Sequence, residues 1–354
     1  MKLIVRRRFY KHTYLKVILT VAAIGLTLLI SMVILYLASN IPPEDFIYAV
    51  YMGLIDPSTL RYLIPLTLCG LGLTLPYKAG IWNIGSEGQL LSGAIIATYL
   101  ALYIYPTDIN PIIGIPLLLI ASFMAGAATA LVAGFLKARY NLNEILSTLM
   151  LNYIIIGLGN YLVYGPWRGA TQYGYPRTDI IPSQLWIRNI EILGIRINMT
   201  LIIVILASAL ALNYIIKHTR FGYDITVYGL NRDAAIYSGI SPEKVIILTM
   251  LISGGLAGLA GAGEVLAIHR QLIRVQDVSA GYGYMAILVA WLSRMDPMST
   301  ILSGYLVAAL ISTGYTLQIL AGLTIGAVNL FIGGLLVLAT ALDFLLEYEV
   351  EIRW

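Results

Sequence analysis

Long apolar stretches with few charges between them constrain the fold of this chain more than any other feature. Of its 354 residues, 59% are hydrophobic and only 11% are charged, whereas a soluble domain carries about 25% charged residues. A water-soluble fold cannot bury so much apolar surface. Soluble enzymes, DNA-binding proteins and disordered chains are therefore excluded, and the sequence predicts an all-α, polytopic transmembrane helical bundle.

Ten candidate spans follow from these stretches, at about 20 residues for each membrane-crossing helix. Val17–Leu37 is too long for a signal peptide and lacks a small-residue cleavage site, so we expect an uncleaved first span. The eighth segment, Tyr282–Ser293, is too short to cross the bilayer and predicts a half-helix or re-entrant segment. The spans cover 17–37, 61–77, 85–105, 111–135, 144–164, 199–216, 245–268, 282–293, 298–319 and 324–346.

The distribution of Lys and Arg predicts the orientation of these spans. With the N-terminus inside, 15 of the 22 basic residues fall on the cytoplasmic side. We expect a single transmembrane domain over 1–354, located in the cell membrane, with both termini cytoplasmic. Its main parts outside the membrane are a cytoplasmic N-terminus at 1–16, an extracytoplasmic loop at 165–198 and a cytoplasmic loop at 217–244.

Residues that would support catalysis or metal binding are scarce. The chain has one cysteine, Cys69, and three histidines that lie far apart without HExxH spacing. No metal site and no membrane metalloprotease chemistry are expected. No Gly-Lys pair occurs, so there is no Walker A motif, and any use of ATP must come from another polypeptide.

The cytoplasmic loop contains the signals of a short helix over Arg232–Ser238. Asn231 is a suitable N-cap, Asp233 places a negative charge near the positive end of the helix dipole, and Gly239 is a suitable C-terminal residue to end the helix. A helix of two turns is unstable alone in water, so it must dock, either on its own membrane domain or on a partner. The residues singled out here are Asn231, Arg232, Asp233, Ala234, Ala235, Tyr237 and Gly239.

Span seven carries small residues at a spacing of four, namely Gly254, Gly258 and Ala262. This spacing favours close helix packing without chemistry. Glu264 follows near the exterior end of the span. An acidic residue within a span is a functional candidate, although at this depth it could simply be solvated.

A second polar segment lies between spans two and three. Ser86 can cap span three and Glu87 lies in its first turn, which explains both residues structurally. Capping does not explain Asn83 and Gln89, so we predict a substrate-facing or gating role for this segment.

Span five places Glu144, Thr148 and Asn152 on one helical face. Interhelical hydrogen bonding is favoured over a pathway role for them. The candidate substrate-path residues are then Asn83, Glu87, Gln89, Thr148, Asn152 and Glu264.

Five segments, in order between about residues 60 and 335, resemble one family. They are KAGIWNIGSEGQLLSGA, NEILSTLMLNY, YGLNRDAAIYSGI, SGGLAGLAGAGEVLAIHRQL and GYGYMAILVAWLSRMDPMS. These segments resemble the permease subunits of ATP-binding-cassette (ABC) importers of the branched-chain amino acid, ribose and nucleoside permease family. NEILSTLMLNY, GEVLAIHRQL and AILVAWLSRMDP are most similar to its nucleoside and simple-sugar branch.

The resemblance implies two permease subunits, identical or different, in the lipid bilayer, with cytoplasmic ATPases and an extracytoplasmic substrate-binding protein. It implies that Arg232–Ser238 is the coupling helix, so a bulky charge at Ala234 or Ala235 should uncouple transport. ATP and Mg would be bound by the ATPase, and this chain would hold no cofactor, bind no nucleic acid and not itself be an enzyme. Spans two to five and seven to ten would be inverted repeats.

Several functions stay open at this point. The lack of ionisable residues near span centres suggests a neutral polar solute, such as a nucleoside or simple sugar, with a branched-chain amino acid as the alternative. An ion-coupled secondary transporter normally needs ionisable residues deep in the membrane, and none is near a span centre. A membrane enzyme has no constellation of nucleophile, base or metal ligands to support it.

Overall fold

The structure is a computed structural model that divides into two compact units. We call Met1–Thr59 with Leu306–Trp354 the terminal unit, and Leu60–Tyr305 the central unit. The predicted spans 17–37 and 324–346 fall almost entirely outside the described residues, and the single permease domain stays a prediction. The structure describes residues 2–7, 29, 32–33, 36, 41–105, 110–170, 174–192, 195–322, 326, 330, 333–334, 337, 341 and 348–353.

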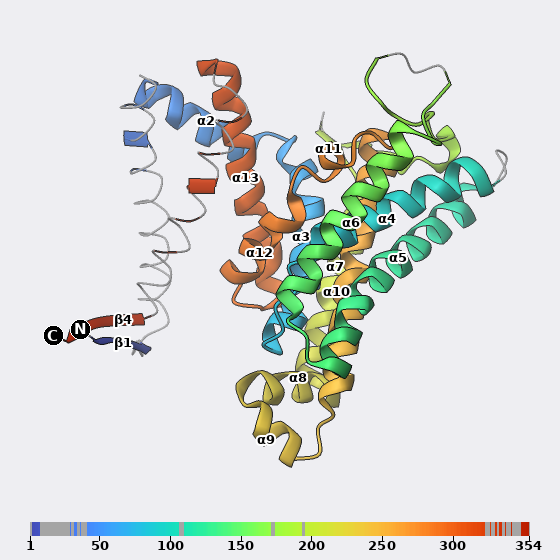
Figure 1. Ribbon diagram of the computed structural model, residues 1–354. Helices are drawn as coiled ribbons and strands as arrows, with labels where there is room; N and C mark the ends of the chain where they lie inside the picture. The colour runs from blue at the N-terminus through green and yellow to red at the C-terminus, as the bar shows by residue number, and fades with distance from the viewer. Residues whose placement is uncertain are drawn as a thin grey trace. The chain divides into compact units, whose positions relative to one another are not determined.

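Seven helices in the described part of the chain are long and apolar enough to cross a membrane (Figure 1). They confirm the predicted helical membrane bundle and correspond to spans two to seven and span nine. The largest difference is at the end of span four, where the helix continues to Tyr140. They are α3 (Thr59–Lys78), α4 (Ser86–Tyr99) with the π-helix η1 (Leu100–Ile104), α5 (Pro111–Tyr140), α6 (Glu144–Tyr164), α7 (Met199–His218), α10 (Pro242–Gly263) with the π-helix η3 (Glu264–His269), and α13 (Pro297–Ala321).

Shorter elements connect these helices. The predicted half-helix is confirmed as α12 (Tyr282–Leu292), and the predicted cytoplasmic helix is α9 (Arg232–Tyr237). The sequence did not predict the other short elements of the central unit. They are α8 (Arg220–Leu230), α11 (Val275–Ser279), the 3₁₀ turn η2 (Ser183–Leu185), and the antiparallel strands β2 (Ile190–Ile192) and β3 (Ile195–Ile197).

Local sequence explains where the helices begin. The Asn143 side chain accepts a hydrogen bond from the Ile145 N–H at 2.9 Å and so caps α6. Asn110 caps α5 in the same way, immediately before Pro111. Both arrangements satisfy N–H groups that a helix start leaves free, which is why these boundaries agree with the sequence.

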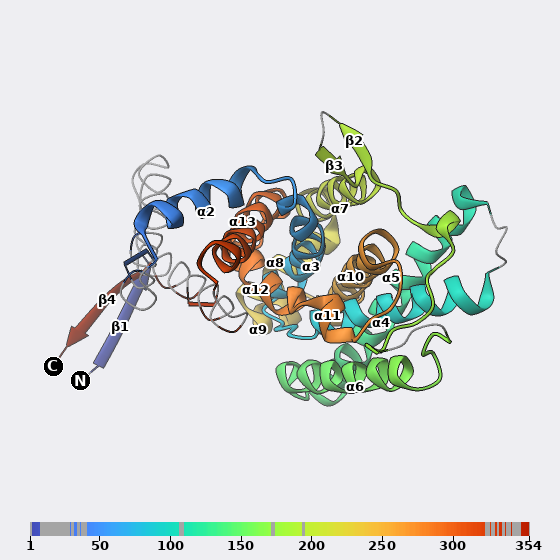
Figure 2. The ribbon, with the colours of Figure 1, turned by 90° about the horizontal axis from the view of Figure 1, so that it is seen from above.

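Helix α10 packs against α5 and α4 at the centre of the unit (Figure 2). A Cβ atom on Gly254 would lie 2.4 Å from the Gly126 carbonyl oxygen, and one on Gly258 would lie 2.1 Å from that of Ser122. Only glycine permits such close backbone contact. Ala262 is also fully buried, so the small residues of span seven all lie in the helix interface.

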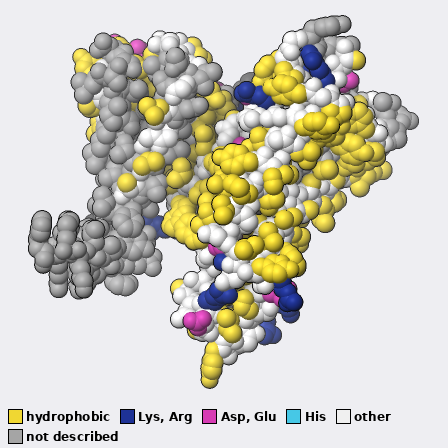
Figure 3. Space-filling view, in the orientation of Figure 1, with side chains coloured by type: hydrophobic (Ala, Val, Ile, Leu, Met, Phe, Trp, Pro, Cys, Tyr) yellow, Lys and Arg dark blue, Asp and Glu magenta, His cyan; other side chains and the backbone are white. Residues whose placement is uncertain are grey.

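The outer surface of the central unit suits lipid. Hydrophobic side chains cover the face visible over α5 and α6, whereas Lys and Arg gather at the α8–α9 end and at the opposite end (Figure 3). Exposed residues on these helices include Ile120, Tyr153 and Ile154. An apolar belt between two charged ends is the expected pattern for a membrane protein.

The terminal unit brings the two ends of the chain together. β1 (Lys2–Arg7) pairs antiparallel with β4 (Tyr348–Arg353), with Lys2 opposite Arg353. The same unit contains α2 (Pro43–Ile55), which the sequence did not predict, and a small buried cluster that includes Phe46 and Leu317. The strand pairing therefore brings the two ends of the chain next to each other.

Candidate functional site

A buried polar cluster forms where the segment before α4 enters the helical bundle. Asn83 and Gln89 form a reciprocal amide pair, in which Asn83 Nδ2 donates to Gln89 Oε1 at 3.1 Å and Gln89 Nε2 donates to Asn83 Oδ1 at 3.0 Å. Asn83 Nδ2 also donates to the Ser253 hydroxyl of α10 at 2.9 Å. The cluster therefore joins the start of α4 to the central helix.

Helix α6 holds the same segment from its other side. Asn152 Oδ1 accepts a hydrogen bond from the Gly88 N–H at 2.9 Å, and its Nδ2 donates to the Ile84 carbonyl at 2.9 Å. The Thr148 hydroxyl accepts from the Ile84 N–H at 3.2 Å. These contacts satisfy backbone groups that a non-helical segment leaves unpaired, and they match the interhelical role that the sequence favoured.

The Glu87 carboxylate connects α4 with α12. Its Oε2 accepts a hydrogen bond from the Gly283 N–H at 2.9 Å. The Glu87 side chain is only 3% exposed. A buried carboxylate that accepts a hydrogen bond at a helix start is stabilised by that bond and by the helix dipole.

The starts of α4 and α12 also touch directly. A Cβ atom on Gly283 would lie 2.3 Å from the backbone nitrogen of Glu87. The two interrupted segments of the chain, which are 196 residues apart at the Glu87–Gly283 bond, thus meet at their helix starts. A single sequence gives no signal for this meeting.

Five of the six predicted path residues share this site, and all five are buried. Asn83, Thr148 and Asn152 are 0% exposed, while Glu87 is 3% exposed. Their polar atoms are bonded to one another and to backbone groups, so they hold the interrupted segments in place within this chain. Their role toward a solute stays a prediction.

Glu264, the sixth predicted residue, pairs with His269 outside this cluster. It lies in η3 and is only 2% exposed, so the suggestion that it is solvated is wrong. Its Oε2 lies 3.5 Å from His269 Nε2. The pair is placed at the end of α10 that meets the 165–198 segment.

The described part of the segment 165–198 packs along the residues that follow α10. The Ile181 N–H donates to the Arg270 carbonyl at 2.9 Å, and the Arg270 guanidinium lies 4.2 Å from the centre of the Trp186 ring. Asp277 closes the other end by binding Arg274 at 2.8 Å and the Tyr175 hydroxyl. Burial alone would raise the pKa of Asp277, but these hydrogen bonds hold it below its ordinary value.

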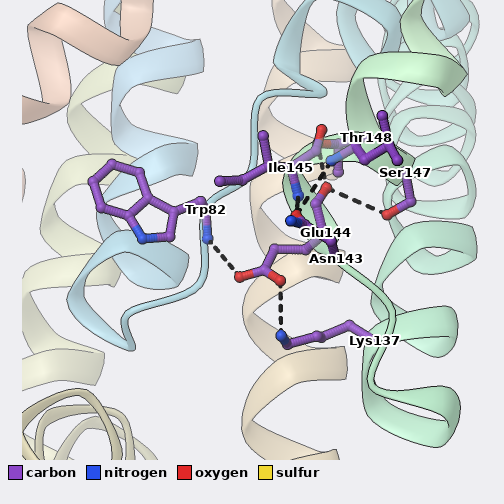
Figure 4. A network of polar contacts seen from close by, with 8 residues as sticks. Trp82, Lys137, Asn143, Glu144, Ile145, Ser147 and Thr148 are labelled. Carbon is purple, nitrogen blue, oxygen red and sulfur yellow. Dashed lines mark hydrogen bonds and ion pairs between the residues drawn. The ribbon is translucent and has the colours of Figure 1, made fainter.

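An ion pair joins α5 and α6 beneath the polar cluster. Lys137 Nζ lies 2.8 Å from Glu144 Oε2, and Glu144 Oε1 accepts a hydrogen bond from the Trp82 N–H at 3.4 Å. Figure 4 shows the Trp82 indole pointing away from this ion pair. The sequence identified Glu144 but gave no indication of Lys137 or Trp82 as its partners.

The predicted coupling segment forms α9, with its N-cap as expected. Asn231 Oδ1 accepts a hydrogen bond from the Ala234 N–H at 3.0 Å, and Gly239 has a φ of +79°. Arg232, Asp233 and Ala234 are exposed. The helix therefore begins and ends where the sequence predicts.

The two sides of α9 differ in a way that corrects the sequence analysis. Ala235 is 0% exposed and faces the chain itself, whereas Tyr237 is 96% exposed and Leu230, just before the helix, is 82% exposed. A charge at Ala235 would disturb folding, so it does not test coupling. The most exposed large hydrophobic side chains at this end are those of Tyr237 and Leu230.

Sites for a metal are not apparent in the part of the chain that the structure describes. There, no group of three or more His, Cys, Asp or Glu side chains is placed to hold a metal ion. The single cysteine, Cys69, is buried.

Comparison with known proteins agrees with this architecture. The sequence profile of the family described as "Branched-chain amino acid transport system / permease component" matches residues 58–340. The chain is 28% identical to the glucose ABC transporter permease protein TsgB13 of Haloferax volcanii over 82% of this chain and 77% of that protein. It is 32% identical to the guanosine ABC transporter permease protein NupP of Bacillus subtilis, over 77% of this chain and 73% of that protein.

A third relative is the nucleoside ABC transporter permease protein NupB of Lactococcus lactis. It is 30% identical over 71% of this chain and 70% of that protein. No solved structure gives a significant match to this chain.

Proposed function

Because the chain belongs to the family of branched-chain amino acid transport system permease components, we propose that it forms the translocation path for a nucleoside or a simple sugar. The chain is a membrane-spanning permease subunit of an ABC importer and is not itself an enzyme. Membership of this family implies an ATPase and a substrate-binding protein as partners.

The charges of the central unit favour a neutral solute. The Glu87 carboxylate accepts a hydrogen bond from the Gly283 N–H, and Glu144 is paired with Lys137. Both carboxylates are engaged within the chain, which favours a solute without an ammonium group. The relatives named for guanosine, nucleoside and glucose transport support the same choice. A branched-chain amino acid stays the alternative because the family description names it.

The observation that carries the coupling to ATP is the exposed surface of α8 and α9. Tyr237 is 96% exposed at the end of a helix capped by Asn231. Helix α8 supports it from the membrane side, because a Cβ atom on Gly229 would lie 2.0 Å from the Lys78 carbonyl oxygen of α3. An aromatic side chain held on a rigid support suits the anchor of a protein interface. The proposed occupant of this surface is the cytoplasmic ATPase.

The remaining parts of the assembly follow from this function. A second permease subunit, identical or different, would complete the path, and ATP and Mg would be held by the ATPase rather than by this chain. The excess of basic residues around α8 and α9 supports a cytoplasmic location for that end. The same bias over residues 1–16 supports cytoplasmic termini, which the pairing of β1 with β4 keeps on one side.

The substrate class is tested on the partner binding protein. Calorimetric titration of that protein with uridine, guanosine, glucose and leucine should show binding of a nucleoside or a sugar. Binding of leucine alone would instead favour the branched-chain amino acid alternative.

A further inference from the structure

Two tryptophans of the central unit stack on each other at its surface. The ring centroids of Trp82 and Trp291 are 5.5 Å apart with an angle of 26° between the planes. Trp82 is 42% exposed and Trp291 is 39% exposed. Tyr77 supports the pair from beneath, with its ring centroid 5.6 Å from that of Trp82.

The position of the pair follows from the two contacts between residues 82–87 and α12. At one end of α12 Trp82 stacks on Trp291, and at the other Glu87 accepts the hydrogen bond from Gly283. The non-helical segment before α4 therefore runs alongside α12. The 11 residues of α12 span about 16 Å at about 1.5 Å per residue, roughly half of the hydrocarbon thickness.

Non-helical backbone at membrane depth is tolerated only when it is buried in protein or lines a water-filled cavity. Asn83 and Gly85 of this segment are buried, whereas the Trp82 indole is exposed. Discontinuous transmembrane helices typically form the substrate site of transporters, and the exposed pair lies where two such segments run side by side. This position favours a place for the pair on the surface that lines the path.

The chemistry of this surface selects a class of solute. The polar groups of the neighbouring cluster are occupied by contacts within the chain. The exposed indole faces are therefore the groups that this surface presents to a solute. Aromatic rings bind planar heterocyclic bases by stacking, whatever the identity of the base. We propose that Trp82 and Trp291 form a stacking site for the base of a nucleoside in the cytoplasmic half of the path. This inference rests on the proposed function and narrows its substrate to a solute with a planar ring.

Fluorescence tests binding directly in the complete importer held in lipid nanodiscs. The tryptophan emission of the pair is obtained by subtracting the emission of the double variant Trp82→Leu/Trp291→Leu from that of the native chain. Uridine should quench this emission saturably, and glucose should not. Quenching by brominated lipid in place of uridine would show a membrane-interface anchor and overturn the proposal. A response to glucose alone, or no response at all, would overturn it too.

Uptake of uridine provides the second measurement. Trp82→Leu and Trp291→Leu should each lower the initial uptake rate by about 5- to 150-fold, the range that corresponds to one base–aromatic stack of about 1–3 kcal/mol. Trp82→Phe and Trp291→Phe should retain most of it. ATPase activity stimulated by the binding protein reports that the variants assemble.

A matched control is Trp167, which stacks on Tyr99 with centroids 5.7 Å apart and an angle of 14° but lies outside the interrupted segments. Trp167→Leu should leave uptake unchanged, and unchanged uptake in the Trp82 and Trp291 variants would overturn the proposal. The fluorescence experiment requires no transport. Failure of ATP-driven uptake would therefore reject the proposed function. Absence of the stacking site is detected separately, by the fluorescence measurement.

Discussion

At the scale of single residues, the Asn152 amide ties α6 to the segment that leads into α4. It serves both the Gly88 N–H and the Ile84 carbonyl, and it is fully buried. An amide in this position fixes irregular backbone that has no helical partners of its own. The amide therefore matters because it fixes the conformation of the whole segment, not because of any single contact.

Replacement of this amide gives the first prediction. Asn152→Ala should lower the free energy of unfolding by about 2–4 kcal/mol, because two buried backbone groups lose their partner. Thermal unfolding of the purified protein in detergent measures the change. The control Ser147→Ala removes one longer bond of 3.3 Å on the same helix and should have little effect. Equal effects of the two substitutions would contradict the account.

Asp277 gives the second prediction, which concerns pH. Its pKa is lowered in the folded protein from the ordinary value of 3.8 by the hydrogen bonds of Arg274 and Tyr175. The contribution of this carboxylate to stability is therefore fully present above pH 3.8 and is lost as the pH falls through the folded pKa.

Limited proteolysis of the exterior segment checks this expectation. Cleavage within residues 174–192 should rise below pH 3.8 in the native chain. Asp277→Asn should be cleaved more readily at neutral pH and show a smaller dependence on acid. An unchanged acid response in that variant would assign the effect to another group.

At the scale of helices, the contact of α10 with α5 depends on glycines that have no room for a side chain. Gly258→Ala should destabilise the protein by about 1–3 kcal/mol or more, because its Cβ would lie 2.1 Å from the Ser122 carbonyl oxygen. Gly157 of α6 has nothing within 4 Å of the same atom. Gly157→Ala should therefore be neutral or stabilising by up to about 1 kcal/mol. Comparable losses from both variants in thermal unfolding would rule out this packing.

The exposed end of α9 gives a prediction about coupling. Tyr237→Asp should leave folding unchanged, because the side chain is 96% exposed, yet lower ATPase association and uptake by about tenfold or more. Tyr237→Phe should retain both activities. Ala235→Asp, at a buried position, should reduce the amount of folded protein instead. Normal uptake and normal ATPase association by Tyr237→Asp would remove α9 from the interface.

Helices with strong boundaries were predictable from the sequence. Helix α6 begins after Asn143, whose side chain caps it, and its predicted range of 144–164 agrees with the structure. The polar helix α8 and the short helix α2 were missed because neither has an apolar stretch long enough to suggest a span. Their existence depends on packing that a sequence pattern does not contain.

The residues of the site could be selected from the sequence, but their arrangement in space could not be predicted. Asn83 was selected because helix capping does not explain it, and Thr148 because it shares one helical face with Glu144 and Asn152. Their joining through residues 83–89, and the contributions of Ser253 and Tyr284, arise from contacts between segments 64 to 170 residues apart. The stacking of Trp82 on Trp291 is of the same kind, because an isolated tryptophan near a span end otherwise indicates a membrane anchor.

At the scale of the whole molecule, the chain provides a path and a coupling surface but no source of energy. The interrupted segments meet inside the central unit at Glu87 and Gly283, while α9 presents Tyr237 at its surface. In the proposed function, the ATPase drives the movement of the solute through α9. The predicted inverted repeat of spans two to five and seven to ten stays a prediction, because the last span lies outside the described residues.

Uptake into vesicles tests this central claim most directly. Vesicles that contain the chain with its partner permease and ATPase, supplied with the binding protein outside, should accumulate labelled uridine only when Mg-ATP is present on the ATPase side. The chain alone should accumulate nothing when a sodium or proton gradient is imposed. Gradient-driven uptake by the chain alone, without ATP, would contradict the account.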